Sequence, residues 1–489
     1  MSLLGLAPAG RAAILQALGE GKSSVTDLVA ASALPRRDVE DFLASLPADH
    51  GKVLREYRES RPVLPPDLEE TAASLISGAP SPLKRLDHVQ ATAETLVRRV
   101  RWLTDMFDLR GRSVLFAGDH DVTSLLLARV VPDDVSLTVA DIDERLLDYV
   151  QSAGQGRVRG AWADFRFGLP PSLAQAADVI VTDPPYTPEG LGLFLSRSCE
   201  ALRRDEPDAR IVIAYGHSRR RPDLGVAAQR EILSRDVAID AMLPAFSRYD
   251  GAQAVGSASD WYSCQPSPKA FRRLGPAAQP GIYTRGSQSV ESGASVADSI
   301  PDLGLSGRPA GLVSPAPSGE FAVTVGLGKL LADGVHPSVL GRAPEFVVDL
   351  RDDPGPWLLR SMLALNAERA VFVVPRRHEV PSADLLRAKY ASIAPERAGD
   401  VTAIRCSLAS GDTGDPVVDL ARFVARRAHG RLRNVWREGL TRSGLTKREA
   451  AARVDEAAAA AGLGAADLSR RLIDLPAGRL PALSEALRA

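Results

Sequence analysis

The sequence predicts an α/β protein built around a doubly wound, largely parallel sheet, and two observations lead to this prediction. An apolar run at 114–117 is followed by Gly118 and then by a segment with helical character, 122–130. The run lacks the alternation of a strand with one wet face, so it indicates a strand that is buried on both faces. Strand-like and helix-like segments then alternate from 111 to 215, as they do where helices cover a parallel sheet.

The elements of this region follow from short apolar runs and from helical spacing between them. The predicted strands are 113–116, 136–140, 158–162, 178–182 and 210–214, and the predicted helices are 122–130, 144–151, 171–176 and 191–202. Residues 205–270 are expected to complete the sheet. An apolar stripe predicts a further helix over 86–100, on which Asp87, Gln90 and Glu94 share one side. That side is either a solvated face or an acidic wall of a ligand cleft.

The length of 489 residues predicts about three domains. Residues 1–60 show three short helical patterns and a wing-like ending, which predicts a winged helix-turn-helix-like module. Residues 59–82 are proline-rich and are expected to form a connector to the doubly wound domain, 83–272. Residues 273–319, rich in Gly, Ser, Ala and Pro, predict a flexible linker. Residues 320–489 are expected to form an additional C-terminal α/β and helical domain, with strands at 345–350, 369–374 and 401–404.

The composition is that of a soluble globular protein, and the net charge of −1 gives no global attraction to nucleic acid or to a membrane. No signal peptide is evident, and no apolar run approaches the ~20 residues that span a bilayer. The third N-terminal helix carries acids among its arginines, which disfavours nucleic acid as a partner. Three widely spaced cysteines give neither a disulfide framework nor a metal-binding spacing and fit a cytoplasmic protein: Cys199, Cys264 and Cys406.

Acidic residues follow four of the predicted strands: Asp119 and Asp121, Asp141 and Asp143, Asp164, and Asp183. Ligands of open α/β sheets bind at the carboxyl ends of the strands, so these side chains are expected to share one cleft. Asp141 stands about twenty residues after the glycine turn, where ribose hydroxyls are held. Asp164 can accept from an adenine amino group, and Phe165 can pack on the ring. The pair Asp119 and Asp121 would repel a pyrophosphate and favour a cationic ligand.

The run Asp183-Pro-Pro-Tyr186 ends the fourth strand of this series. Pro184 and Pro185 fix φ and carry no N–H, so the loop is stiff and holds the Asp183 carboxylate and the Tyr186 ring over the cleft. Such a loop offers an acceptor for the N–H of an attacking nitrogen and an aromatic face for a base or a cation. Similar Asp/Asn-Pro-Pro-Tyr motifs occur in enzymes that alkylate exocyclic amino groups with S-adenosylmethionine.

Taken together, these motifs resemble the branched-chain polyamine synthases, the N4-bis(aminopropyl)spermidine synthases. The resemblance extends over about residues 1–270. The turn of that family usually has the sequence Gly-Asp-Asp-Asp, whereas His120 stands in place of the middle acid here and removes one negative charge. The segments that carry the resemblance are Asp87-His-Val-Gln90, Thr92-Ala-Glu-Thr95, Gly118-Asp-His-Asp121, Asp141-Ile-Asp143, Asp183-Pro-Pro-Tyr-Thr187 and residues 191–197.

The resemblance implies a Rossmann-like sheet of the class I methyltransferase type. It also implies transfer of aminopropyl groups from decarboxylated S-adenosylmethionine, the co-substrate, to a polyamine acceptor such as spermidine, with no metal required. A homodimeric assembly is compatible with the sequence. Asp183 is expected to orient the uncharged attacking nitrogen and to stabilise the ammonium as it develops, with Tyr186 walling the same channel. The expected catalytic residues are Asp183, Tyr186, Asp119 and Asp121, and the expected cofactor-binding residues are Gly118, Asp119, Asp141, Asp143, Asp164, Phe165, Gln90 and Glu94.

Two other functions fit parts of the pattern. An S-adenosylmethionine-dependent amino-methyltransferase acting on DNA or RNA would use the Asp183-Pro-Pro-Tyr186 loop and the helical N-terminal module. The acids at the glycine turn and the lack of a basic surface in the first 270 residues oppose it. A non-catalytic, ligand-sensing regulator would bind DNA through the winged helix, and it requires a clustered basic surface on residues 24–58 that the sequence does not provide.

Overall fold

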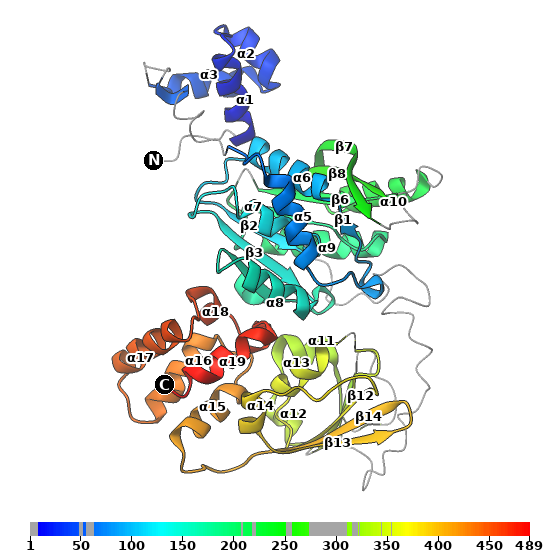
Figure 1. Cartoon of the computed structure of the whole chain (residues 1–489), viewed down its shortest axis with the longest axis vertical. Helices are drawn as coiled ribbons and strands as arrows, with labels where there is room; N and C mark the ends of the chain where they lie inside the picture. Colours follow the sequence, from blue (N-terminus) through cyan, green and yellow to red (C-terminus); the bar gives the residue numbers. More distant parts are fainter. Residues whose placement is uncertain are drawn as a thin grey trace.

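The computed structural model describes residues 8–47, 52–54, 63–206, 209–217, 222–250, 257–272, 311–314, 321, 323–343, 345–353 and 355–489, and the structural statements below concern this part of the chain. Figure 1 shows the N-terminal helices at one end, a domain with a mixed sheet in the middle, and the C-terminal domain at the other end. None of the described helices combines the length and the apolarity that a bilayer crossing requires.

The N-terminal module consists of three short helices, α1 (Pro8–Gly19), α2 (Val25–Ser32) and α3 (Arg36–Ser45). Ser24 caps α2 by accepting from the backbone N–H of Asp27, a role that serine often has at the start of a helix. A small core between the helices contains Ile14, Leu28 and Val39. Residues 52–54, where the wing was expected to begin, are helical, and the rest of the expected wing lies outside the described residues. The winged helix therefore stays a prediction.

The connector predicted over 59–82 contains a helix, α5 (Leu68–Gly78), which packs against α6 (Ala93–Met106). The helix predicted over 86–100 is wrong in its first half. A 3-10 turn, η1 (Lys84–Leu86), is followed by Asp87 in the left-handed region and by the short strand β1 (Gln90–Ala91). The α-helix begins only after Thr92, whose side chain accepts from the N–H of Thr95. Asp87, Gln90 and Glu94 therefore do not lie on one side of one helix.

The first sheet has eight strands in the order β1-β7-β8-β6-β5-β2-β3-β4. Five neighbouring strands are parallel: β6, β5, β2, β3 and β4. Beyond β6, the strands β8, β7 and β1 continue the sheet in antiparallel pairs. The chain runs outward from β2 to β4 and then crosses back to β5, so the switch point lies between β2 and β5. The strand bounds are β2 Ser113–Ala117, β3 Ser136–Asp141, β4 Val158–Trp162, β5 Val179–Thr182, β6 Arg210–Tyr215, β7 Val237–Asp250 and β8 Ala258–Pro266.

Helices cover both faces of this sheet (Figure 1), and each face buries its own apolar cluster. This is the arrangement that keeps both faces of parallel strands away from water, and it agrees with the predicted α/β class. The helices are α7 Thr123–Leu127, α8 Glu144–Ala153, α9 Pro188–Ala201 and α10 Pro222–Ser234, with 3-10 turns η2 Phe165–Phe167, η3 Pro171–Leu173 and η4 Ala270–Arg272.

The C-terminal domain has a six-stranded sheet in the order β10-β9-β11-β12-β14-β13. Strand β9 lies within 273–319, the segment predicted to be a linker, so the predicted linker extends too far toward the C-terminus. Residues 273–310 of the predicted linker lie outside the described residues. The strands are β9 Gly311–Ser314, β10 Val323–Gly326, β11 Glu345–Asp349, β12 Arg369–Pro375, β13 Tyr390–Ala398 and β14 Val401–Leu408.

The helices of the C-terminal domain include α17, which begins with a capping box formed by Thr446 and Glu449. Their apolar side chains share one continuous cluster with α8 of the first domain, which includes Leu147 and Ile473. The two domains are therefore packed against each other. The bounds are α11 Leu327–Asp333, α12 Pro337–Leu340, α13 Trp357–Ala364, α14 Asp384–Lys389, α15 Pro416–Arg426, α16 Leu432–Arg442, α17 Lys447–Ala460, α18 Ala465–Ser469, η5 Leu472–Asp474, η6 Ala477–Arg479 and α19 Leu480–Ala486.

Candidate active site

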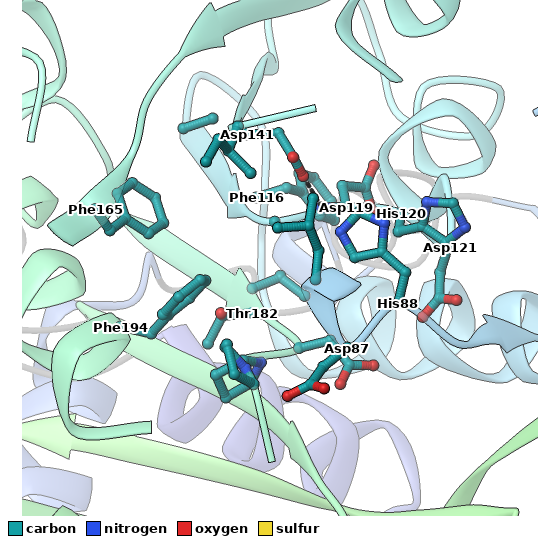
Figure 2. A pocket seen from close by; sticks show the side chains of 18 of the residues that line it. Asp87, His88, Phe116, Asp119, His120, Asp121, Asp141, Phe165, Thr182 and Phe194 are labelled. Atoms are coloured by element: carbon teal, nitrogen blue, oxygen red, sulfur yellow. Dashed lines mark hydrogen bonds between the residues drawn. The ribbon is translucent and has the colours of Figure 1, made fainter. Parts of the chain in front are cut away.

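A cavity opens at the carboxyl ends of β2, β3, β4 and β5, at the switch point of the first sheet. The space between its walls is about 880 Å³, a value that includes open solvent at the mouth. Phe165 and Phe194 form one side, and His88 and His120 lie on the opposite side (Figure 2). Six aspartates line the cavity against a single arginine, Arg99: Asp87, Asp119, Asp121, Asp141, Asp164 and Asp183.

The glycine turn after β2 forms the floor of this cavity. Gly118 has φ +75°, a value that side chains disfavour, and its N–H donates to the carbonyl of Ala140 at 2.9 Å. Four residues later Val122 has φ +56°, which is a strained conformation for a β-branched residue. The short helix α7 follows directly. In this turn the side chain of Asp119 lies toward the N–H of Ser124, and that of Asp121 lies toward Ala91 and Arg99.

Asp119 and Asp141 lie side by side in the floor (Figure 2), and neither forms an ion pair with a basic side chain of the described chain. Asp119 accepts from the N–H of Ser124 at 3.1 Å. Asp141 accepts from the N–H groups of Asp119 and Asp143, at 3.3 and 2.8 Å. Burial raises the pKa of Asp119 to about 8 and that of Asp141 to about 7. These two carboxyls are therefore the ones that a cationic guest would stabilise in the ionised form.

Asp121 belongs to a separate, internally paired network. Its Oδ1 accepts from the backbone N–H of Ala91 at 2.7 Å, and its Oδ2 accepts from Arg99 at 2.8 Å. The Arg99 side chain is 3% exposed and also donates to Asp183 at 3.1 Å and to the hydroxyl of Tyr249 at 2.8 Å. Burial opposes the charge of Arg99, but Tyr249, Asp121 and Asp183 raise its pKa above the usual value. The two acids that were expected to favour a cationic ligand therefore differ, because Asp121 pairs with Arg99 and Asp119 pairs with no basic side chain of the described chain.

Sequence reasoning missed Arg99, although a signal was present. Arg99 stands three residues after Leu96 and four before Leu103, on the buried side of α6. A charged residue at such a position is almost never buried without a partner. Its place in the apolar stripe therefore indicated a buried ion pair. The guanidinium also lies over the Trp261 ring, 5.1 Å from its centroid, and Trp261 itself is fully buried in the core.

Asp183 lies at the end of β5 with two tyrosine hydroxyls directed at it. Tyr186 donates to Oδ1 at 3.1 Å, and Tyr249 donates to Oδ2 at 2.7 Å. The Asp183 side chain is 23% exposed, more than those of the other acids of the floor. Burial raises the pKa of Asp183, while Arg99 lowers it. Thr187 then caps α9, so the stiff Pro-Pro loop is fixed at both ends.

The structure places the remaining predicted residues in three ways. Phe165 lines the cavity and packs edge-on against Phe194, with ring centroids 4.9 Å apart. Asp143 does not line it, because Asp143 caps α8 and pairs with Arg145 at 2.6 Å. Asp164 lines the cavity, but its oxygens already receive N–H groups from Arg166 and from Trp357 of the C-terminal domain. A direct bond from Asp164 to an adenine amino group is therefore not supported.

Gln90 and Glu94 lie outside the cavity. Gln90 is in β1, which pairs with β7 at the sheet edge. The Glu94 side chain is 66% exposed and forms an ion pair with Arg98 on the outer face of α6. The expectation that they bind the cofactor is corrected, because the helix begins at Ala93 and turns Glu94 toward solvent. The solvated-face interpretation fits Glu94.

His88, His120 and Asp143 form the group in the described chain that could hold a metal ion, since each offers a ligand atom and these atoms lie within 4.8 Å of one another. The two histidine rings stack, with centroids 4.4 Å apart. Burial lowers the pKa of His120 to about 4, so its imidazole is neutral at pH 7. The position that is acidic in the family's turn is thus occupied by a neutral ring.

Comparisons with known proteins agree with the motifs. Residues 67–265 match the family model of the branched-chain polyamine synthase A C-terminal domain. The chain is 35% identical to an uncharacterized protein of Methanocaldococcus jannaschii over 176 residues, which are 35% of this chain and 43% of that protein. It is 31% identical to the N(4)-bis(aminopropyl)spermidine synthase of Thermococcus kodakarensis over 142 residues, which are 28% of this chain and 40% of that enzyme.

Among solved structures, the branched-chain polyamine synthase of Thermus thermophilus, in complex with N4-aminopropylspermidine and 5'-methylthioadenosine, is 19% identical with a TM-score of 0.37. That match covers 59% of this chain and 94% of the other. The chain spans less than half the length of the curated relatives it matches. The region that matches the family model, residues 67–265, begins at α5, leaves out the N-terminal helices and ends before the C-terminal domain. On these matches, residues 67–265 are similar in sequence to the branched-chain polyamine synthases.

Proposed function

We propose that the chain transfers aminopropyl groups from decarboxylated S-adenosylmethionine to a polyamine acceptor such as spermidine. The observation that carries this proposal is the charge of the cavity, which is lined by six aspartates and one arginine. Two of these aspartates, Asp119 and Asp141, form no ion pair with a described basic side chain. Such a cavity favours guests that bear positive charge and disfavours guests that bear a carboxylate.

The choice of donor follows from the same charge. Ordinary S-adenosylmethionine carries a carboxylate on the aminoacyl arm, and this group would approach the acids of the glycine turn. The decarboxylated compound presents only an ammonium there, and a charge-assisted hydrogen bond to Asp119 would contribute about 1.5–3 kcal/mol. In this arrangement the nucleoside packs between Phe165 and Asp141, and the aminopropyl arm points toward Asp119 and Asp183.

The reaction is a displacement at the carbon next to the sulfonium. The acceptor nitrogen forms the new C–N bond with its lone pair, the C–S bond breaks, and neutral 5'-methylthioadenosine leaves. The nitrogen must be uncharged to attack, although a free alkylamine has a pKa near 10. Asp183 accepts an N–H of the neutral nitrogen and stabilises the ammonium that develops. Tyr186 and Tyr249 hold the Asp183 carboxylate in place.

Calorimetric titration with decarboxylated and with ordinary S-adenosylmethionine tests this proposal first. The full chain is then supplied with spermidine, and the products are analysed by mass. We expect preference for the decarboxylated donor and mass gains of one aminopropyl unit. Asp183→Asn should abolish these gains while leaving donor binding largely intact. Asp133→Asn serves as the matched control, because the Asp133 side chain is 97% exposed.

Other outcomes would identify other functions. Preference for the carboxylated donor, together with methyl transfer to a DNA or RNA oligonucleotide, would favour an amino-methyltransferase and refute the aminopropyl proposal. Binding of a polyamine without turnover, together with retention on duplex DNA, would favour the regulator. The Asp183-Pro-Pro-Tyr186 loop is compatible with the first of these, and the three N-terminal helices are compatible with the second.

A further inference from the structure

The loop that leaves β4, residues 162–167, carries one wall of the cavity and is held from behind by the C-terminal domain. Ala163, Asp164 and Phe165 of this loop line the cavity. On its other side the indole N–H of Trp357, the first residue of α13, donates to Oδ2 of Asp164 at 3.0 Å. Both side chains are buried, with Trp357 3% and Asp164 4% exposed. A residue outside the family-matched region thus touches a wall of the candidate active site.

The hydrogen bonds to Asp164 saturate its carboxylate. Its Oδ1 accepts from the backbone N–H and from Nε of Arg166, at 3.1 and 3.0 Å. Its Oδ2 accepts from Nη2 of Arg166 at 2.7 Å and from Trp357 at 3.0 Å. A carboxylate offers about four acceptor directions, and these four bonds occupy them. Asp164 therefore anchors the loop and has no free acceptor direction for the ligand.

Aromatic packing adds to this anchor. The Arg166 guanidinium lies over the Trp357 ring, 5.1 Å from its centroid, and the Phe167 ring lies 5.4 Å from Trp357. Gly328 of α11 approaches Phe167 so closely that an added Cβ would lie 3.2 Å from the Phe167 ring. The end of the loop is therefore enclosed by α11 and α13 together.

A second contact from the same helix holds the start of the loop. Arg360 lies three residues after Trp357 and is fully buried; its guanidinium lies 4.8 Å from the Trp162 ring centroid. It pairs with Glu144 of α8 and donates to the carbonyl of Leu475 at 2.7 Å. Residues three apart on a helix share a face, so one face of α13 contacts both ends of the loop.

We propose that the C-terminal domain holds the nucleoside end of the cavity in place from behind, with Trp357 as a positioning residue that fixes the loop carrying Phe165. This inference rests on the proposed function for the identity of the nucleoside, 5'-methylthioadenosine or its sulfonium precursor. Trp357 does not touch the ligand. It acts through Asp164, whose buried carboxylate would lose one of its four donors if the indole N–H were removed.

Two substitutions at one position separate positioning from bulk packing. Trp357→Phe keeps an apolar ring and removes the N–H donor. Trp357→His loses the larger ring but keeps an N–H at the corresponding ring position. The matched control is Trp436→Phe, since Trp436 is buried in α16, whose packing partners α15, α17 and α18 all belong to the C-terminal domain.

The first readout is calorimetric binding of 5'-methylthioadenosine to the full chain. We expect Trp357→Phe to weaken it by about twofold to thirtyfold, the range over which substitutions along a network of contacts can change the coupling between two sites. Trp357→His should bind more tightly than Trp357→Phe even if it melts at a lower temperature, and Trp436→Phe should bind like the wild type. Wild-type affinity in Trp357→Phe, or equal losses in both Trp357 variants, would overturn the inference.

The second readout needs no ligand. Amide hydrogen exchange in 163–167 should be faster in Trp357→Phe than in the wild type and in Trp436→Phe. If the wild type fails to bind 5'-methylthioadenosine but the exchange difference is found, the proposed function fails and the coupling of the C-terminal domain to this loop stands. If exchange in the loop is unchanged in Trp357→Phe, Trp357 is not a positioning residue, whatever the ligand.

Discussion

Replacing Arg99 by methionine tests the central electrostatic feature of the site. Methionine is unbranched and uncharged, so the substitution keeps an apolar stem and leaves Asp121 and Asp183 without their cation. Asp121 would keep the N–H of Ala91, and Asp183 would keep two tyrosine hydroxyls. Removing one partner of a buried ion pair costs about 3–5 kcal/mol. We therefore expect Arg99→Met to be destabilised by about that amount, although the cavity becomes more negative.

The assay is thermal unfolding of the full chain, followed by circular dichroism. In a domain of this size 1 kcal/mol lowers Tm by about 2–4 °C, so Arg99→Met should unfold roughly 6–20 °C below the wild type. The double variant Arg99→Met/Asp121→Asn removes one of the orphaned charges and should recover part of the loss. A Tm for Arg99→Met within 2 °C of the wild type would refute the reasoning, because Asp121 and Asp183 would then not depend on Arg99.

Three further predictions concern the acids around this network. Burial raises the pKa of Asp119 to about 8 and that of Asp141 to about 7, so both carboxyls are protonated at pH 6 and a cationic donor must displace their protons to bind. The affinity for this donor should therefore rise from pH 6 to pH 8.5, and calorimetry in two buffers of different ionisation enthalpy should detect the released protons. Asp119→Asn should weaken donor binding without lowering Tm, whereas Asp121→Asn should lower Tm, and the reverse pattern would contradict the assigned roles. Tyr249→Phe should lower kcat by about tenfold or more, since a hydrogen bond to a charged group such as Asp183 contributes about 1.5–3 kcal/mol; an unchanged kcat would remove Tyr249 from the mechanism.

The sheet that carries the site could be predicted because its strands are short apolar runs ended by polar residues. Strand β4 coincides with the predicted 158–162, and the acids after β2, β3, β4 and β5 come to one edge as the doubly wound topology requires. The helix α5 was missed because prolines surround it, although prolines that flank a segment are compatible with a helix between them. Glu94 was misplaced because the stripe over 86–100 continues through a turn and a strand.

Contacts between distant segments could not be predicted from local pattern. Tyr249 reaches Asp183 because a bulge-interrupted pairing of β7 and β8 places the end of β7 beside α6. Trp357 reaches Asp164 across 193 positions of sequence. Neither contact has a periodic signal, since each depends on how two finished elements pack. Arg99 is an intermediate case. Its place in a buried stripe indicates that it has an acidic partner, but the sequence does not show which acid this is.

The acids of the cavity divide into two groups, and this division explains how one site can bind cations and still fold. Asp121 and Asp183 share Arg99, so part of their negative charge is compensated before any ligand arrives and their positions are fixed. Asp119 and Asp141 accept from backbone N–H groups and pair with no basic side chain of the described chain, and burial favours their protonated forms. A cationic guest can therefore supply the charge that these two carboxyls lack. The paired group sets the geometry of the attacking nitrogen, and the unpaired group recognises the donor. A cavity in which all of these acids lacked cations would be too costly to bury, whereas one in which all were paired would have no preference for a positively charged guest.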